Sequence, residues 1–144
     1  MSWEPVVPIH QGGGGHGVRA AIRIDRANGS KRLVVALGED VLRLMRWEPG
    51  IPMTVLRGSS QDLGKVRLSR SAGSKGYKLS RLHSSKGGKH QFGLRLPTWY
   101  GMPKECCRMT SCHWEVAENR SFVEIRLPRW AISDHGFDVP EAAE

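Results

Sequence analysis

Three cysteines and a histidine lie close together in the second half of the chain and could in principle ligate a metal ion. They are Cys106, Cys107, Cys112 and His113. Tetrahedral zinc sites usually draw ligands from two separated pairs, such as C-x2-C … C-x2-C, whereas the spacing here is C-C-x4-C-H. Cys112 and His113 are also neighbours on a predicted strand, so their side chains should point to opposite faces. We therefore expect buried thiols in a reducing compartment, with no metal ion and no other cofactor.

The residue types that commonly perform hydrolysis show no catalytic arrangement. The six histidines are scattered, and no Ser/His/Asp or Cys/His order matches that of a known hydrolase. The adjacent acids Glu39 and Asp40 stand where a helix is predicted to begin, and the helix dipole favours carboxylates there. We expect a protein that is not an enzyme.

Positive charge is the chemical feature with the clearest pattern. The formal net charge is +8, and the stretch from Leu63 to Lys104 contains ten Lys or Arg and no Asp or Glu. Residues 131–144 contain four acids and neither Lys nor Arg. A long stretch of one sign attracts polyanions, which makes nucleic acid the favoured partner. A solvated basic face and an acidic protein partner are the alternatives.

Short strands and turns must position these cations. The 144 residues include 17 Gly and 8 Pro, and only 39% are hydrophobic, which favours strands with many turns over long helices. Val18–Arg26 alternates apolar and polar residues, the pattern of a half-buried strand. Asn28-Gly29 supplies a turn, and the apolar run Leu33–Leu37 follows it. Residues 18–37 are thus predicted to form a β-hairpin with a basic tip.

The segment after this hairpin predicts a short helix and a second hairpin. Gly38-Glu39-Asp40 begins the helix, and Pro49-Gly50 terminates it. Two further strands are predicted at Met53–Leu56 and Val66–Leu68. Residues 18–68 therefore form a ββαββ pattern.

The same pattern of apolar positions recurs 59 residues later without a gap. The matched segments are Val18–Ile24 with Tyr77–His83, Val35–Gly38 with Leu94–Pro97, Thr54–Leu56 with His113–Glu115, and Val66–Leu68 with Ile125–Leu127. Few residues are identical, so the repeat rests on pattern. It predicts two ββαββ units in one chain.

The first unit is similar to the AbrB/SpoVT family of swapped-hairpin DNA-binding domains. The segments that carry the resemblance are the basic strand Arg19–Arg26, the strand Leu33–Leu37, the helix Glu39–Arg46, the turn Trp47-Glu48-Pro49-Gly50 and the hairpin Met53–Leu68. The second unit departs further. Leu96-Pro97 resembles the family's Ile-Pro helix start, but Gly101 and Pro103 would shorten the helix to about one turn, and Met109 replaces the turn glycine.

The expected fold is mainly β with short helices (α+β), in which the two ββαββ repeats interleave as a swapped-hairpin-like barrel. In the resembled family two chains interleave, so one chain here is expected to form a pseudo-dimeric monomer, with a homodimer as the alternative. The predicted divisions are a flexible Gly-rich arm (1–17), repeat one (18–68), a linker (69–76), repeat two (77–128) and an acidic tail (129–144).

The resemblance and the charge together imply a DNA-binding transcriptional regulator. Two basic hairpin arms, expected on the same side of the barrel, would grip duplex DNA through its phosphates. The candidate nucleic-acid-binding residues are Arg19, Arg23, Arg26, Lys31, Arg32, Lys78, Arg81, Lys86 and Lys89. RNA stays open as an alternative ligand.

Aromatic residues support a second hypothesis. Trp47 and Trp114 are expected in the core, whereas the candidate partner-binding residues are Trp3, Trp99, Tyr100 and Trp130. With them the chain would be a protein-interaction factor that docks on nucleic-acid machinery such as RNA polymerase. An antitoxin-like regulator is a third hypothesis.

No apolar run approaches the roughly 20 residues of a membrane span, and the N-terminus lacks the pattern of a signal peptide. We expect a cytoplasmic protein without a membrane partner.

Overall fold

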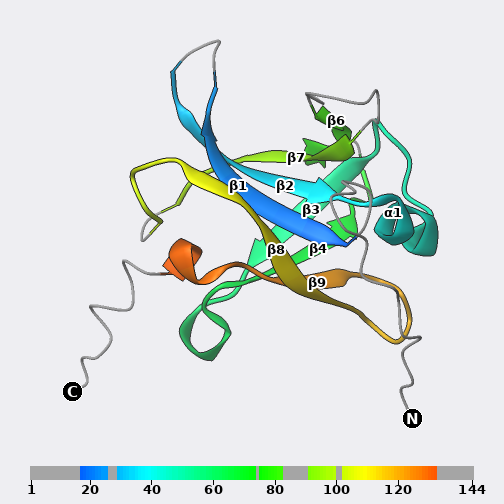
Figure 1. Cartoon of the computed structure of the whole chain (residues 1–144). Helices are drawn as coiled ribbons and strands as arrows, with labels where there is room; N and C mark the ends of the chain where they lie inside the picture. Colours follow the sequence, from blue (N-terminus) through cyan, green and yellow to red (C-terminus); the bar gives the residue numbers. More distant parts are fainter. Residues whose placement is uncertain (1–16, 26–28, 74, 83–90, 100–101, 133–144) are drawn as a thin grey trace.

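The computed structural model describes the chain except residues 1–16, 26–28, 74, 83–90, 100–101 and 133–144. The described part is mainly β, as the sequence predicts, and contains a single α-helix (Figure 1). The strands are β1 (Val18–Ile24), β2 (Lys31–Leu37), β3 (Pro52–Arg57), β4 (Lys65–Arg70), β5 (Tyr77–Lys78), β6 (Ser80–Leu82), β7 (Gln91–Pro97), β8 (Cys107–Val116) and β9 (Val123–Arg126). The helices are α1 (Glu39–Met45) and the 3-10 helices η1 (Ser60–Asp62) and η2 (Arg129–Ile132).

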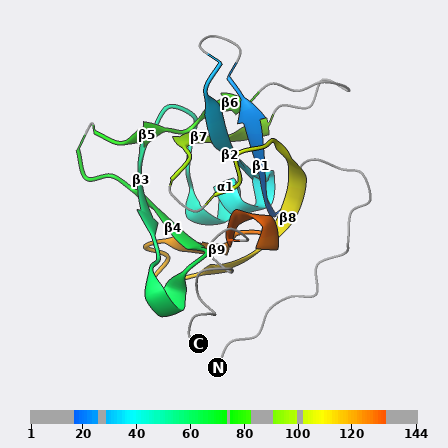
Figure 2. The ribbon, with the colours of Figure 1, turned by 90° about the vertical axis from the view of Figure 1, so that its left-hand side faces the viewer.

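All nine described strands belong to one antiparallel sheet that curls into a nearly closed barrel. Their order is β5-β3-β4-β9-β8-β1-β2-β7-β6. Figure 2 shows the strands arranged round a ring. The two strands at the ends of this order, β5 and β6, are consecutive in the chain and are separated by Leu79 alone. One short segment therefore forms both edges of the sheet.

Leu79 lies at the corner between these two edges. Its side chain is fully buried in the core, its N–H donates to Ile51 O over 2.9 Å, and its carbonyl accepts from Gly50 N over 2.6 Å. On either side of it, Tyr77 pairs with Met53 of β3, and Ser80 pairs with Gly93 of β7. The sequence predicts one continuous strand over 77–83, but the described part is broken at Leu79 because its two halves pair with different neighbours.

The first hairpin shows how alternation builds the barrel wall. Val18, Ala20 and Ile22 of β1 join the main core cluster, together with the alternate residues Leu33, Val35 and Leu37 of β2. Gly29 adopts φ +74° in the turn, and its N–H donates to Asp25 O over 2.7 Å. The predicted hairpin is confirmed, and its intervening side chains face outward.

The two ends of the barrel are covered by short helical segments. α1 lies at one end, where Val41 is fully buried and Trp47 follows the left-handed residue Arg46 (φ +58°). η2 lies at the other end, with Ala131 buried and Trp130 packed on the core (Figures 1 and 2).

Asp40, which the sequence places at the start of the helix, connects α1 to β1 through hydrogen bonds. The N–H of Gly17 donates to both carboxylate oxygens of Asp40, over 2.8 and 3.0 Å, and Gly38 N donates to Gly17 O over 2.8 Å. Asp40 therefore anchors the start of β1 to the first turn of the helix.

The strand registers follow the 59-residue offset at several places. Val35 of β2 lies opposite Leu94 of β7, and Val66 of β4 lies opposite Ile125 of β9; 94 − 35 and 125 − 66 both give 59. The pair Val18–Cys112 between β1 and β8 corresponds in the same way to the pair Tyr77–Met53 between β5 and β3.

Two parts of the chain depart from the offset. Thr54 lies opposite Ser69, whereas its counterpart His113 lies opposite Arg126, two residues away from the position that the offset predicts. The described residues between β7 and β8 form no second α-helix; Met102 N donates to Trp99 O over 3.1 Å in a turn, and both side chains pack on the core. β4 extends through Arg70, two residues beyond the strand that the sequence predicts at Val66–Leu68.

No helix in the described ranges is both long and apolar enough to cross a membrane.

The position of Leu79 predicts that it is central to stability. Leu79→Ala should lower the free energy of unfolding by about 2–5 kcal/mol, since it leaves a cavity where the barrel closes. Urea denaturation followed by circular dichroism measures this. Leu56→Ala is the matched control, because Leu56 is 58% exposed and should cost less than about 0.5 kcal/mol. Equal costs for the two variants would contradict the closing role of Leu79.

Candidate nucleic-acid interface

One wall of the barrel carries cations on its outer face. This basic wall consists of β1, β2, β7 and β6, which are neighbours in the sheet. Because alternate residues of these strands enter the core, the intervening ones face outward. They are Arg19, Ala21 and Arg23 of β1, Arg32, Val34 and Ala36 of β2, Gln91, Gly93, Arg95 and Pro97 of β7, and Ser80 and Leu82 of β6.

Three of these outward arginines gather at one end of the basic wall and form what we name the arginine cluster: Arg23, Arg32 and Arg95. Arg23 lies directly opposite Arg32, which places their Cβ atoms about 4.5–5.5 Å apart. Arg95 lies opposite Val34 and is thus diagonal to Arg32, about 7–8 Å away. Arg23 and Arg95 are exposed.

The carboxylate of Asp25 lies beside this cluster. Asp25 Oδ2 is 3.7 Å from Arg32 Nε, and both side chains are about one-third exposed. The three arginines and Asp25 together carry a net positive charge. Like charges on directly opposed strand positions repel, so this end is electrostatically suited to an anion.

The other described cations of the first hairpin differ from the cluster in environment. Arg19 faces outward and is half-buried between Ala36 and Ser111. Lys31 is half-buried opposite Ile24, on the face that points toward the barrel interior. Arg26 lies outside the described residues.

The second basic hairpin, which is the repeat-two counterpart of the β1–β2 hairpin and includes β5, β6 and β7, does not add a matching group of cations. Lys78 is exposed on β5 opposite Pro52, and Arg81 is exposed on β6 opposite Phe92, whose side chain packs on the core. Neither belongs to the outward row that contains the arginine cluster. Lys86 and Lys89 lie outside the described residues.

The two hairpins share the basic wall, but they point in opposite directions. Since β2 and β7 are antiparallel, Arg32 near the first turn lies beside Pro97, and Phe92 near the second turn lies beside Leu37. The strand ends that lead into the two turns therefore lie at opposite ends of the basic wall, whereas the sequence analysis expected the two basic hairpins on the same side of the barrel.

Arg95 is the residue that the sequence analysis missed. Arg95 belongs to the cationic stretch from Leu63 to Lys104, but no local sequence pattern indicated that its strand pairs with β2. The 59-residue offset carried the signal, because a two-fold arrangement centred on Val35 and Leu94 places Arg95 beside Val34.

The tryptophans are mostly structural. Trp47 is buried and Trp114 packs on the core, as predicted. Trp99 also packs on the core, with the Arg57 guanidinium 5.5 Å from its ring centroid. Trp130 donates from Nε1 to Thr110 Oγ1 over 3.1 Å. Trp3 and Tyr100 lie outside the described residues.

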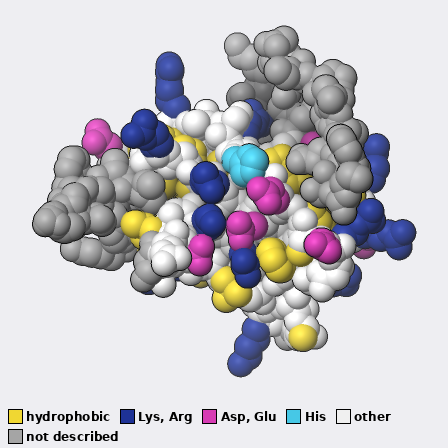
Figure 3. Space-filling view, turned by 90° about the horizontal axis from the view of Figure 1, so that it is seen from below, with side chains coloured by type: hydrophobic (Ala, Val, Ile, Leu, Met, Phe, Trp, Pro, Cys, Tyr) yellow, Lys and Arg dark blue, Asp and Glu magenta, His cyan; other side chains and the backbone are white. Residues whose placement is uncertain are grey.

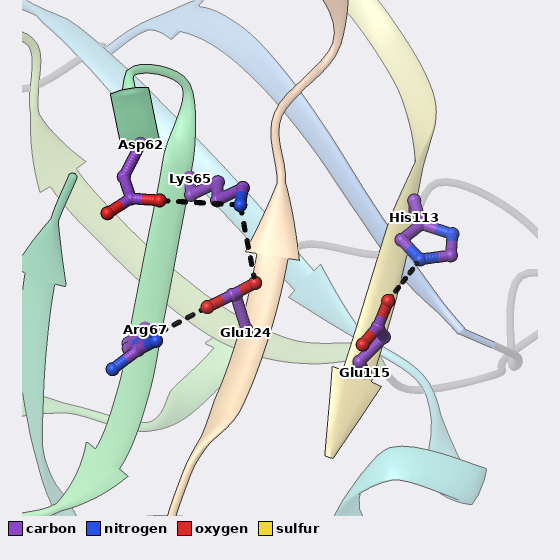
Figure 4. A network of polar contacts seen from close by, with 6 residues as sticks. All are labelled: Asp62, Lys65, Arg67, His113, Glu115 and Glu124. Carbon is purple, nitrogen blue, oxygen red and sulfur yellow. Dashed lines mark hydrogen bonds and ion pairs between the residues drawn. The ribbon is translucent and has the colours of Figure 1, made fainter. Parts of the chain in front are cut away.

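The outer face of β4, β9 and β8 has a different charge pattern, with cations and acids side by side (Figure 3). Glu124 lies 2.9 Å from Arg67 Nε and 4.0 Å from Lys65 Nζ, and Lys65 also contacts Asp62 (Figure 4). These groups neutralise one another, so this face is poorly suited to hold a polyanion.

His113 and Glu115 form a separate pair on the same face (Figure 4). The hydrogen bond from His113 Nε2, 2.9 Å long, lowers the pKa of the Glu115 carboxyl, and the charge of His113 adds to this. Glu115 therefore remains ionised near neutral pH and is a poor proton donor for acid catalysis.

The cysteines and His113 do not converge. Cys112 is buried whereas the adjacent His113 is exposed, so their side chains point to opposite faces as predicted. Burial raises the pKa of the Cys112 thiol to about 12. Within the described ranges, no group of three or more His, Cys, Asp or Glu side chains is arranged to hold a metal ion.

A shallow open groove of about 440 Å³ lies beside α1. Its apolar floor includes Trp47 and Phe92, and its rim carries both acids and arginines. Because the lining contains two acids and two arginines, the groove shows no preference for an anion.

Comparison with known proteins adds no constraint: no family model, no curated protein and no solved structure matches this chain.

Thiol reactivity tests the placement of β8. In the native protein, Ellman's reagent at pH 8 should modify the exposed Cys106 quickly and Cys107 more slowly, because desolvation and the nearby Glu105 raise the pKa of Cys107. Cys112 should react only after unfolding in denaturant. Mass spectrometry of digested samples identifies each site, and rapid native labelling of Cys112 would contradict the described packing.

Proposed function

We propose that this chain is a DNA-binding transcriptional regulator that holds duplex DNA against its basic wall. The observation that carries the proposal is the arginine cluster, in which Arg23, Arg32 and Arg95 share one outward face and Asp25 lies 3.7 Å from Arg32. Guanidinium groups remain charged at all working pH values and bind phosphate oxygens through paired N–H donors.

In this proposal the barrel consists of two interleaved ββαββ units, similar in arrangement to AbrB/SpoVT domains but supplied by one chain. The registers support it: a residue that lies opposite its own counterpart marks a local two-fold axis, and both Val35–Leu94 and Val66–Ile125 are such pairs. The swapped pairing of β1 with β8 and of β3 with β5 has the same relation. The chain would then be a pseudo-dimeric monomer.

The geometry of the wall supports binding to the DNA backbone. The arginines stand on paired strands, so their Cα positions are fixed before binding and little backbone entropy is lost. Figure 1 shows the β1–β2 hairpin extending beyond the body of the barrel, where a duplex could approach it. Contact with roughly three or four phosphates would give a slope of about −3 in log K against log salt concentration.

Fluorescence anisotropy with a labelled random-sequence duplex tests the proposal. The wild-type chain should bind with micromolar affinity at low salt, and affinity should fall steeply as salt rises. Arg23→Ala/Arg32→Ala should weaken binding at least tenfold and make the salt slope shallower by about two.

The matched control is Arg43→Ala/Arg126→Ala, which removes the same charge from exposed positions on α1 and β9. It should leave affinity within about twofold of wild type, apart from the general effect of net charge. If the wild-type chain does not bind at low salt, or if both double variants lose affinity equally, the basic wall is not a DNA site, and a protein partner becomes the leading hypothesis.

A further inference from the structure

The registers allow the two ends of the basic wall to be compared position by position. Under the 59-residue offset, the counterparts of Arg23 and Arg32 are Leu82 and Gln91, and the counterpart of Arg95 is Ala36. Leu82 is 4% exposed and packs with Val34 and Ala36 in a small outer apolar cluster. One end of the wall is therefore cationic, and the equivalent positions at the other end are neutral.

We infer that the wall holds a single composite phosphodiester site, formed by Arg23 and Arg32 of the first hairpin and completed by Arg95 of the second. This inference rests on the proposed function and makes it more specific. The chain would grip duplex DNA at one end of the wall, and Lys78 and Arg81 of the second hairpin would not contribute.

The strand pairing accounts for the composite character of the site. Because β7 runs antiparallel to β2, its last residues lie beside the first residues of β2, next to the turn of the first hairpin. Arg95 therefore belongs to the second half of the sequence but stands at the first hairpin's end of the wall. The other end of β7, which begins at Gln91, lies beside Leu37 and Ala36 of β2.

The three arginines of this site are arranged so that an anion can bind among them. Asp25 Oδ2 lies 3.7 Å from Arg32 Nε, and β2, which carries Arg32, lies between the strands that carry Arg23 and Arg95. No ion pair is formed by Arg23 or Arg95 with any residue in the described part of the chain. A bridging phosphate would reduce the repulsion between Arg23 and Arg32 and would give Arg95 a partner.

The side chains of the wall also indicate which form of nucleic acid fits. Binding to single strands relies on bases that stack on aromatic rings. The outward positions of β1, β2, β6 and β7 that the structure describes carry arginines, small or aliphatic residues and polar groups, with no Phe, Tyr or Trp among them. The site therefore matches a phosphate backbone held in fixed geometry, which is the backbone of a duplex.

Two single variants distinguish the composite site from the alternative in which both basic hairpins bind DNA. Arg95→Ala should weaken binding of a random-sequence duplex about three- to tenfold and reduce the salt slope by about one. Lys78→Ala removes an equally exposed charge from the counterpart of Arg19, and it should leave both quantities within error of wild type. Unchanged thermal denaturation would show that both variants fold.

The inference is overturned if Arg95→Ala binds as tightly as wild type, or if Lys78→Ala loses as much affinity. A labelled single strand of equal length is the second probe, and it should bind several-fold more weakly than the duplex. Single-strand binding equal to that of the duplex would contradict the fixed-backbone site.

A titration of the ¹⁵N-labelled full chain with inorganic tripolyphosphate tests the site without DNA. The amides of Arg23, Arg32 and Arg95 should shift, and those of Leu82 and Gln91 should not. If these shifts occur but no duplex binds, the composite anion site stands and the DNA-binding function fails. If the duplex binds and the shifts are equal at both ends, the function stands and the composite site is wrong.

Discussion

The fold depends on how one six-residue segment closes the barrel. Residues 77–82 supply both edge strands of the sheet, and Leu79 between them is buried in the core while its backbone bonds to Gly50 and Ile51. Without this corner, β3 and β7 would each present an unpaired edge. The inward-facing side chains on the two sides of the barrel would also lose the side chains they pack against. Closure therefore does two things at once: it pairs β5 with β3 and β6 with β7, and it completes a core that neither half of the chain could enclose alone.

Closure also fixes the register that determines where the outward side chains lie. With Val35 opposite Leu94, β2 and β7 place Val34 beside Arg95 and Arg32 beside Pro97. Sliding β7 by one residue would turn Arg95 into the core and expose Leu94 and Leu96, at a large cost in buried apolar area. The apolar residues inside the barrel therefore hold the arginines on the outside in place, although the two sets of side chains do not touch.

The local elements could be predicted from the sequence, and the relations between them only in part. Strand alternation predicts the β1–β2 hairpin, and Pro49-Gly50 marks the end of the first helical segment, because both signals are local. The break at Leu79 could not be predicted, since 77–83 has an ordinary strand pattern and only its pairing with two different neighbours divides it. Lys78 and Arg81 entered the candidate site through the cationic run, whereas Arg95 required knowledge of the antiparallel pairing of β2 with β7. Charge along the chain does not reveal which face of the sheet a cation occupies.

The same alternation rule produces two outer faces of opposite electrostatic character. On β4, β9 and β8, Glu124 contacts both Arg67 and Lys65, so these two cations already have an acidic partner within the fold, although such surface pairs add little to stability. On the basic wall, Arg23 lies opposite another arginine, an arrangement that lowers the stability of the free protein. Stable proteins commonly tolerate such local conflicts at functional sites, where a ligand supplies the missing charge. An anion at this wall would therefore be bound partly because it relieves a repulsion that the closed barrel itself imposes, whereas an anion at the opposite wall would have to displace carboxylates that are already paired.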